Sequence, residues 1–345
     1  MNKAKLLISI ACIIVLQYKI KACSAFSFKV NNSVYIAKSY DWFNGQGYIL
    51  VNKRGETKFS FPVDKNTKSF SWTSKYGSVT FNQYSKDFPN GGINEKGLVI
   101  EVLWLNKTNF GKIKNNKVLN ELQWIQYGLD NFKNVNELLN NIKAISIKRL
   151  YAKVHFFIGD ASGKSAIVEY IKGKLVVNTK PQNMCITNNT YKISESFKVK
   201  LKNKGTRYLK IKSTLKNIPE SLSSNKACNM CFSILKNVKL RNTKWHIVYD
   251  IKSNKILYKS NTHKNIKTIN LNTIQYNQNK KIDINKKYSL FSDFTYVDNF
   301  FLIKKGLYSL SIFIKDEYLT AFNNFILKYT RTNNLHQFLV KNEKL

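Results

Sequence analysis

Alternating apolar and polar residues predict that the chain forms a β-hairpin just after residue 23. Residues 24–30 and 33–40 are both typical of strands, and Asn31-Asn32 between them tolerates the positive φ angles of a tight turn. A two-residue turn would place residue 23 opposite Tyr40, and a three-residue loop would place it opposite Asp41. In either register the hairpin returns Asp41 to residue 23. Lys38 and Asp41 lie on opposite faces by strict alternation, so both reach residue 23 only at a bulge or strand end.

The rest of the pattern predicts more strands and a few helices. Gly91 to Gly97 is predicted to form a tight turn. Runs of β-branched and aromatic residues predict strands at 48–53, 58–62, 98–105, 154–158, 165–171, 175–179, 184–187, 245–250, 255–259 and 268–271. Helical spacing predicts helices at 120–130, 135–144, 205–215 and 227–238, the second with Asn134 as a candidate N-cap. This order predicts an α+β fold of packed sheets with helical layers.

Residues 1–22 have the layout of a secretory signal. A basic start is followed by an apolar run, 6–16, a short polar segment and the small residue Ala22. The apolar run is too short to span a bilayer as a helix, and lysines in the C-terminal tail argue against a span there. Cleavage after Ala22 would leave residues 23–345, predicted as one domain with an unassigned tail from about 288. The product would be exported, either periplasmic or secreted.

Cys23 would then be the first residue of the mature protein. Its thiol is a nucleophile, and an adjacent free α-amine, with an ordinary pKa of about 7.7–8.0, could take the thiol proton. Asp41, returned by the hairpin, could hold that amine. These residues alone leave three interpretations open: a catalytic nucleophile, the lipid-anchored cysteine of a binding protein, and a plain cysteine. Lys21 disfavours lipidation, because a small or apolar residue is expected there.

The composition narrows the function classes further. The formal net charge is +37, but the lysines are spread through every segment together with abundant Asn and Ile. That spread favours a compositional bias, and no nucleic-acid-binding motif accompanies it, so nucleic acid is not predicted as a partner. Five cysteines do not make a disulfide scaffold. Cys228-x-x-Cys231 lacks a second cysteine pair or close His pair, so both are interpreted as structural residues of a buried helix.

Six short motifs, in their order and spacing after Cys23-Ser-Ala-Phe, resemble those of one family. They are Ala37-Lys-Ser-Tyr-Asp-Trp42, Asn94-Glu-Lys-Gly-Leu98, Gly159-Asp-Ala-Ser-Gly-Lys-Ser165, Thr187-Asn-Asn189, Gly205-Thr-Arg-Tyr208 and Trp245-His-Ile-Val-Tyr-Asp250. The chain from Cys23 to about Leu271 thus resembles the choloylglycine hydrolase and penicillin V acylase family of N-terminal-nucleophile hydrolases. Membership would imply a four-layer αββα sandwich, hydrolysis of small-molecule linear amides, no metal or other cofactor, and an assembly such as a homotetramer.

The resemblance also assigns roles to individual residues. It implies Cys23 as nucleophile, Asp41 as the holder of its amine, Asn188 as an oxyanion-hole residue, and Arg207 as the late arginine of the site. Lys38 stands where the family has an arginine, which keeps the positive charge but loses the two-pronged guanidinium.

Trp104 falls on the oxyanion-region position and resembles the Gram-negative branch, whose members cleave penicillin V and, in some cases, N-acyl homoserine lactones. With Trp42, which follows Asp41 directly, it is predicted to wall an apolar acyl pocket. Conjugated bile salts are the bulkier alternative substrate.

Overall fold

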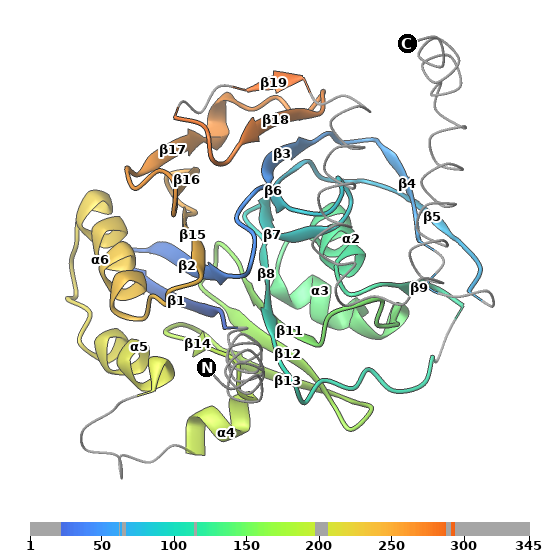
Figure 1. The fold of residues 1–345 in the computed structure, drawn as a ribbon, viewed down its shortest axis with the longest axis horizontal. Coiled ribbons are helices and arrows are strands. Elements are labelled where there is room, and N and C mark those ends of the chain that lie inside the picture. Colours follow the sequence, from blue (N-terminus) through green and yellow to red (C-terminus); the bar gives the residue numbers. More distant parts are fainter. Residues whose placement is uncertain are drawn as a thin grey trace, which may run out of the picture.

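Two antiparallel sheets form the framework of the computed structural model (Figure 1), which describes residues 22–61, 63, 67–113, 116–196, 206–287 and 291–293. In spatial order, the first sheet contains β14 (Cys185–Ile186), β1 (Ser24–Val30), β2 (Ser33–Asp41), β15 (Thr243–Asp250), β16 (Lys255–Ser260) and β17 (Lys267–Asn270). The second contains β13 (Lys174–Lys180), β12 (Ser165–Ile171), β11 (Val154–Gly159), β8 (Val99–Trp104), β7 (Pro89–Asn94), β6 (Ser78–Asn82), β3 (Tyr48–Asn52), β18 (Lys280–Asp283) and β19 (Ser292–Asp293).

The remaining described elements cover or edge these sheets. The helices are α2 (Gln123–Asn131), α3 (Val135–Asn141), α4 (Tyr191–Ser196), α5 (Arg207–Lys216) and α6 (Ser224–Asn237), with short 3₁₀ turns at Ile142–Ala144 and Leu271–Thr273. Two small ribbons pair β4 (Thr57–Phe59) with β5 (Ser71–Thr73) and β9 (Val118–Leu119) with β10 (Ser146–Ile147). Asn134 caps α3 as predicted, its side chain accepting a hydrogen bond from the Glu137 backbone.

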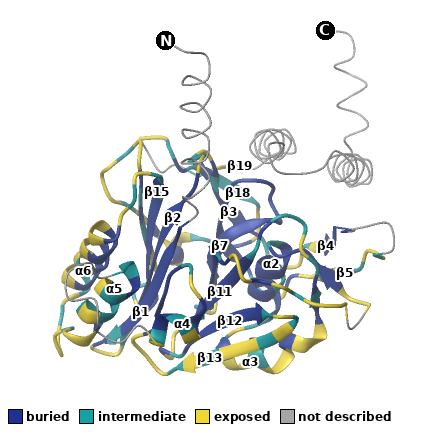
Figure 2. Ribbon diagram, turned by 60° about the horizontal axis from the view of Figure 1, so that its bottom comes forward, coloured by how far each residue is buried: buried dark blue, intermediate teal, exposed yellow. Residues whose placement is uncertain are grey.

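Three apolar clusters arrange these elements in four layers. Residues such as Ile36, Ile247 and Val79 pack between the two sheets. The outer face of the first sheet packs against α5 and α6, and the outer face of the second packs against α2 and α3. Figure 2 shows both sheets largely buried; α3, α5 and α6 have exposed residues on their outer faces, whereas α2 is itself buried along most of its length. The predicted αββα sandwich is therefore confirmed.

The N-terminal hairpin has the two-residue turn that the sequence allowed. Val30 pairs with Ser33, and Asn31 and Asn32 have φ angles of 49° and 57°. Ala25 lies opposite Lys38, so Cys23, two residues earlier, lies on the same face of the sheet as Lys38. Asp41 ends β2, beside a register shift in the neighbouring strand β15. The strand end therefore brings Asp41 and Lys38 to the same corner of the sheet.

The turn predicted at Gly91 to Gly97 is wrong in its first half. Residues 89–94 form the fully buried strand β7, and the chain turns only after Asn94. Close packing explains the glycines of this strand, because a Cβ at Gly91 would lie 1.9 Å from a carboxylate oxygen of Glu101. A Cβ at Gly92 would lie 2.4 Å from the Val79 carbonyl oxygen.

Two of the sequence predictions fall largely outside the described residues. These are the signal segment before Ala22 and most of the tail from about 288. Among the helices that the structure describes, none is long and apolar enough to cross a membrane.

Candidate active site

Cys23 lies at the start of β1, where the two sheets meet, and is only 5% exposed. Ala22 before it is also buried. The Cys23 backbone nitrogen donates a hydrogen bond to Asn188 Oδ1 at 2.9 Å. Cleavage after Ala22 would turn this same nitrogen into the α-amine.

Asn188 follows β14, the edge strand next to β1, and its side-chain amide is used at both ends. Its Oδ1 accepts from the Cys23 nitrogen and from Arg207 Nη2 at 2.7 Å. Its Nδ2 donates to the Trp104 carbonyl oxygen at 2.7 Å, which uses one of the two amide N–H groups. The amide is thus fixed in orientation directly beside residue 23.

Arg207 is the first residue of α5, a helix that begins with Thr206 as its side-chain cap. The Nη1 group donates to the Cys23 carbonyl oxygen at 3.0 Å and to Ser24 Oγ at 2.8 Å. It also lies 3.7 Å from Asp41 Oδ2. Arg207 therefore ties the start of β1 to Asn188 and Asp41, and a lysine could not make all these contacts at once.

Asp41 is fully buried, and its carboxylate accepts hydrogen bonds from Thr243 Oγ1 at 2.5 Å and Ser39 Oγ at 3.4 Å. Burial raises the pKa of Asp41 to about 6, although the Thr243 hydroxyl and the Arg207 guanidinium oppose the shift. In the structure the Cys23 nitrogen donates to Asn188 rather than to Asp41. The carboxylate that could hold a cleaved α-ammonium is nevertheless close enough to perturb the Cys23 thiol.

The Cys23 thiol is not an intrinsically acidic one. Burial, with a smaller contribution from the Asp41 carboxylate, raises its pKa to about 11, and the charges of Lys38 and Arg207 only partly oppose that rise. At neutral pH such a thiol keeps its proton, so it needs a base beside it to become a nucleophile.

Lys38 is fully buried and paired. Its Nζ lies 2.6 Å from Glu101 Oε2 and donates to the Asn90 carbonyl oxygen at 2.8 Å. The other carboxylate oxygen of Glu101 accepts from the Tyr249 hydroxyl at 2.5 Å. The sequence predicts a positive charge here but not its neutralisation by Glu101. The available signal was a single acidic residue inside the apolar run 98–105.

An aromatic pocket opens beside Cys23. Its lining includes Tyr40, Trp42, Tyr84, Trp104 and Tyr151, and its volume is about 50 Å³. The ring centroids of Trp42 and Trp104 are 6.1 Å apart, and each lies within 6.5 Å of the Tyr151 ring centroid. The structure thus brings both predicted tryptophans to the candidate nucleophile. Sequence analysis missed Tyr84 and Tyr151, which come from loops with no distinctive pattern.

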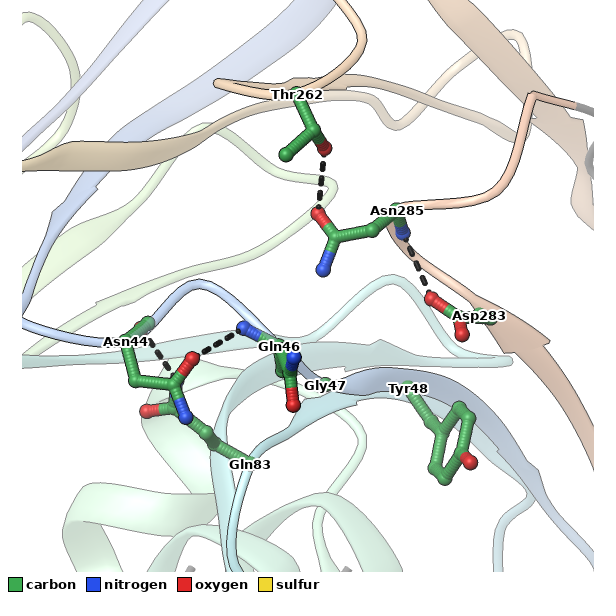
Figure 3. A pocket seen from close by; sticks show the side chains of 8 residues that line it. All are labelled: Asn44, Gln46, Gly47, Tyr48, Gln83, Thr262, Asp283 and Asn285. Atoms are coloured by element: carbon green, nitrogen blue, oxygen red, sulfur yellow. Dashed lines mark hydrogen bonds between the residues drawn. The ribbon is translucent and has the colours of Figure 1, made fainter. Parts of the chain in front are cut away.

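A larger hollow of about 200 Å³ is lined in part by Gln83, whose side-chain oxygen accepts a hydrogen bond from the Tyr40 hydroxyl at 2.7 Å. Figure 3 shows its polar lining, which includes Asn44, Gln83 and Asn285. Its lining residues include no cysteine, histidine or serine, so we place the chemistry at Cys23. Within the described ranges, no three His, Cys, Asp or Glu side chains gather as metal ligands would.

Cys228 and Cys231 lie on the buried face of α6, in the cluster that packs this helix against the first sheet. Neither is in a disulfide. They do not approach Cys23, which agrees with their interpretation as core residues.

The stacked sheets, with a buried cysteine at the start of the first strand, define the class of N-terminal-nucleophile hydrolase folds. A family model described as linear amide C–N hydrolases, choloylglycine hydrolase family, matches residues 23–206, just over half of the chain. The protein belongs to this family.

Particular relatives agree with this membership. A penicillin V acylase of Pectobacterium atrosepticum is 33% identical over 169 residues, a match that covers 44% of each chain. A penicillin V acylase structure from Agrobacterium tumefaciens, 27% identical, superposes with a TM-score of 0.68 over 79% of this chain and 98% of its own. A conjugated bile acid hydrolase variant from Clostridium perfringens, 18% identical, shares the fold with a TM-score of 0.60 over 78% of this chain and 99% of its own.

Proposed function

We propose that this protein, once exported and cleaved after Ala22, hydrolyses linear amides with Cys23 as an N-terminal nucleophile. The observation that carries the proposal is the convergence of three side chains on Cys23: Asn188 on its nitrogen, Arg207 on its carbonyl oxygen and Asp41 beside its thiol. Family membership supports amide hydrolysis as the reaction class.

Acyl transfer begins with proton removal from the thiol. The α-amine is the base that covalent geometry places next to it, and the raised thiol pKa makes such a base necessary. The resulting thiolate attacks the carbonyl carbon of the amide. The second Nδ2 N–H of Asn188, together with a backbone N–H, then stabilises the oxyanion, each donor contributing about 3–4 kcal/mol.

The second half of the reaction releases both products. The α-ammonium donates its proton to the leaving amine nitrogen, the C–N bond breaks, and a thioester remains on Cys23. Water, deprotonated by the same amine, attacks the thioester carbonyl carbon. The C–S bond then breaks, the acid is released, and the α-ammonium returns its proton to the Cys23 sulfur. Asp41 as a carboxylate stabilises the ammonium in both steps, and Arg207 keeps the first residue in place.

The aromatic pocket supports an apolar acyl group as substrate. Trp42, Trp104 and Tyr151 offer rings to an aromatic or alkyl chain, and such acyl groups are less bulky than a steroid. We therefore rank penicillin V first, N-acyl homoserine lactones second and conjugated bile salts last. The two penicillin V acylase relatives support penicillin V as the first choice.

A hydrolysis screen over these three substrate classes tests the proposal, with Cys23→Ala as the control variant. We expect release of phenoxyacetate from penicillin V by the cleaved protein and none by Cys23→Ala. Absence of turnover on all three classes, or equal turnover by Cys23→Ala, would refute it. A lipid-anchored binding protein would instead show a lipidated Cys23 in its intact mass.

A further inference from the structure

His155 and Glu169 form a buried polar pair in the apolar space between the sheets. His155 lies on β11 and Glu169 on β12, directly opposite one another, because the adjacent pair Phe156 and Val168 is in register. Their side chains are 0% and 2% exposed. The next residues on the same face, Phe157 and Ile167, belong to the apolar cluster between the sheets.

This pair contacts both ends of the short segment that carries Asn188. His155 Nε2 lies 2.8 Å from the Thr187 carbonyl oxygen, one residue before Asn188. Glu169 accepts from the Tyr191 backbone nitrogen at 3.0 Å, three residues after Asn188. The two side chains are joined through His155 Nδ1 and Glu169 Oε1 at 3.1 Å.

The chemistry of the donors and acceptors decides where the protons lie in the series of hydrogen bonds from Thr187 through His155 and Glu169 to Tyr191. A carbonyl oxygen only accepts, so His155 Nε2 must carry a proton toward Thr187. The contact between His155 Nδ1 and Glu169 then needs a second proton, on either the ring or the carboxyl group. Both forms leave a Glu169 oxygen to accept from Tyr191. The segment 187–191 is therefore held at both ends by two hydrogen-bonded side chains, His155 and Glu169, which belong to the second sheet.

A third contact fixes the segment from the neighbouring strand. Asn188 Nδ2 donates to the carbonyl oxygen of Trp104, which pairs in β8 with Val154, the residue before His155. Burying a polar pair in this apolar layer costs free energy, and well-packed apolar residues at these two positions would often stabilise the fold as much as the pair does, or more. Stability alone therefore does not explain the pair. We propose, on the basis of the proposed function, that His155 and Glu169 are positioning residues that hold Asn188 for oxyanion stabilisation.

Two substitutions of the pair separate positioning from mere packing. In Glu169→Gln the new side-chain amide can donate a hydrogen bond to Nδ1 of a neutral His155 ring and accept one from the Tyr191 nitrogen, so the hydrogen bonds to both ends of the segment are kept. His155→Phe fills the space but releases Thr187. A displacement of about 1 Å can cost about 10²-fold, so we expect kcat of His155→Phe to fall about 10- to 100-fold with little change in KM. Glu169→Gln should stay within about threefold of the wild type.

A double-mutant cycle with Asn188→Ala gives the decisive comparison. Once the positioned amide is absent, His155→Phe should cost only about threefold or less in kcat. Equal losses from His155→Phe in both backgrounds would overturn the proposal. Ile167→Ala is the matched control, because Ile167 lies on the strand of Glu169 and on the same face of the sheet, but its apolar side chain makes no hydrogen bond to the segment 187–191. It should lower the melting temperature while leaving the kcat of the folded enzyme within about twofold in both backgrounds.

Hydrogen exchange gives a readout that does not need a substrate. In His155→Phe the amides of residues 188–191 should exchange faster, while those of β11 and β12 keep wild-type protection. Unchanged exchange in this segment would refute the positioning role even if the protein hydrolyses amides. Conversely, faster exchange in a wild-type-like fold that hydrolyses no amide would refute the proposed function and leave the structural link supported.

Discussion

Replacing Lys38 by methionine should destabilise the protein far more than an ordinary surface change. The side chains of Lys38 and its partner Glu101 are 1% and 0% exposed, and their charged atoms lie 2.6 Å apart. In Lys38→Met the Glu101 carboxylate stays buried, and among the described residues its remaining hydrogen-bond partner is the Tyr249 hydroxyl. Removing one member of a buried ion pair typically costs about 3–5 kcal/mol, because the remaining charge is desolvated without compensation.

Thermal and urea unfolding measure this cost directly. For a chain of this size, about 3–5 kcal/mol corresponds to a fall in melting temperature of about 4–7 °C. Lys38→Arg is the matched control, since it keeps the charge and should retain most of the stability and activity. The double variant Lys38→Met, Glu101→Gln removes both charges at nearly constant volume. We expect it to recover most of the lost stability and most of the activity of the folded enzyme.

Two results would refute this reasoning. If Lys38→Met unfolds within about 1 kcal/mol of the wild type, the ion pair is not what holds this corner of the sheets. If the double variant is stable but inactive, the charge of Lys38 serves catalysis directly rather than neutralising Glu101.

Two further predictions concern pH and the acyl pocket. The α-amine, with an ordinary pKa of about 7.7–8.0, must be unprotonated to act as the base, so kcat/KM should first fall as the pH drops through that range. Burial raises the pKa of Asp41 to about 6, so a second, steeper fall should follow below about pH 6, where Asp41 is no longer a carboxylate. Thr243→Val removes a hydrogen bond to that carboxylate and should move this limb upward by about one to two pH units; an unmoved limb would contradict the role of Asp41. Trp104→Ala should weaken the binding of substrates with long or aromatic acyl groups most. In the wild type, a series of acyl chains should gain about 0.8 kcal/mol of binding free energy per methylene. Equal losses of binding at every chain length in Trp104→Ala would contradict this prediction.

Local sequence patterns predicted the N-terminal hairpin and most of the long strands, because turn residues and β-branched runs determine these elements over a few residues. The Asn31-Asn32 turn set the hairpin register and so placed Asp41 at Cys23, and β-branched runs marked β11, β12 and β15. Glycine at 91 was misread as a turn signal because its cause, the Glu101 carboxylate, comes from a neighbouring strand. The short helix α4 was missed because its six residues are mostly polar and carry no periodicity.

The candidate site divides in the same way. The signal layout, the hairpin register and the family resemblance predicted seven site residues, and the structure gathers all of them around one corner of the sheets: Cys23, Asp41, Asn188, Arg207, Lys38, Trp104 and Trp42. The hydrogen-bonding partners of these residues were not predicted, because Thr243 lies 202 residues from Asp41 and Glu101 lies 63 residues from Lys38 in the sequence. Such pairs depend on how strands distant in sequence align, which single-sequence patterns do not specify.

Rapid-quench intact mass spectrometry during turnover of penicillin V tests the central claim most directly. The account predicts a mature chain that begins at Cys23 and, before the steady state, carries one phenoxyacetyl group that peptide mapping assigns to Cys23. An active protein that still retains Ala22, or an acyl group mapped to any other residue, would contradict it.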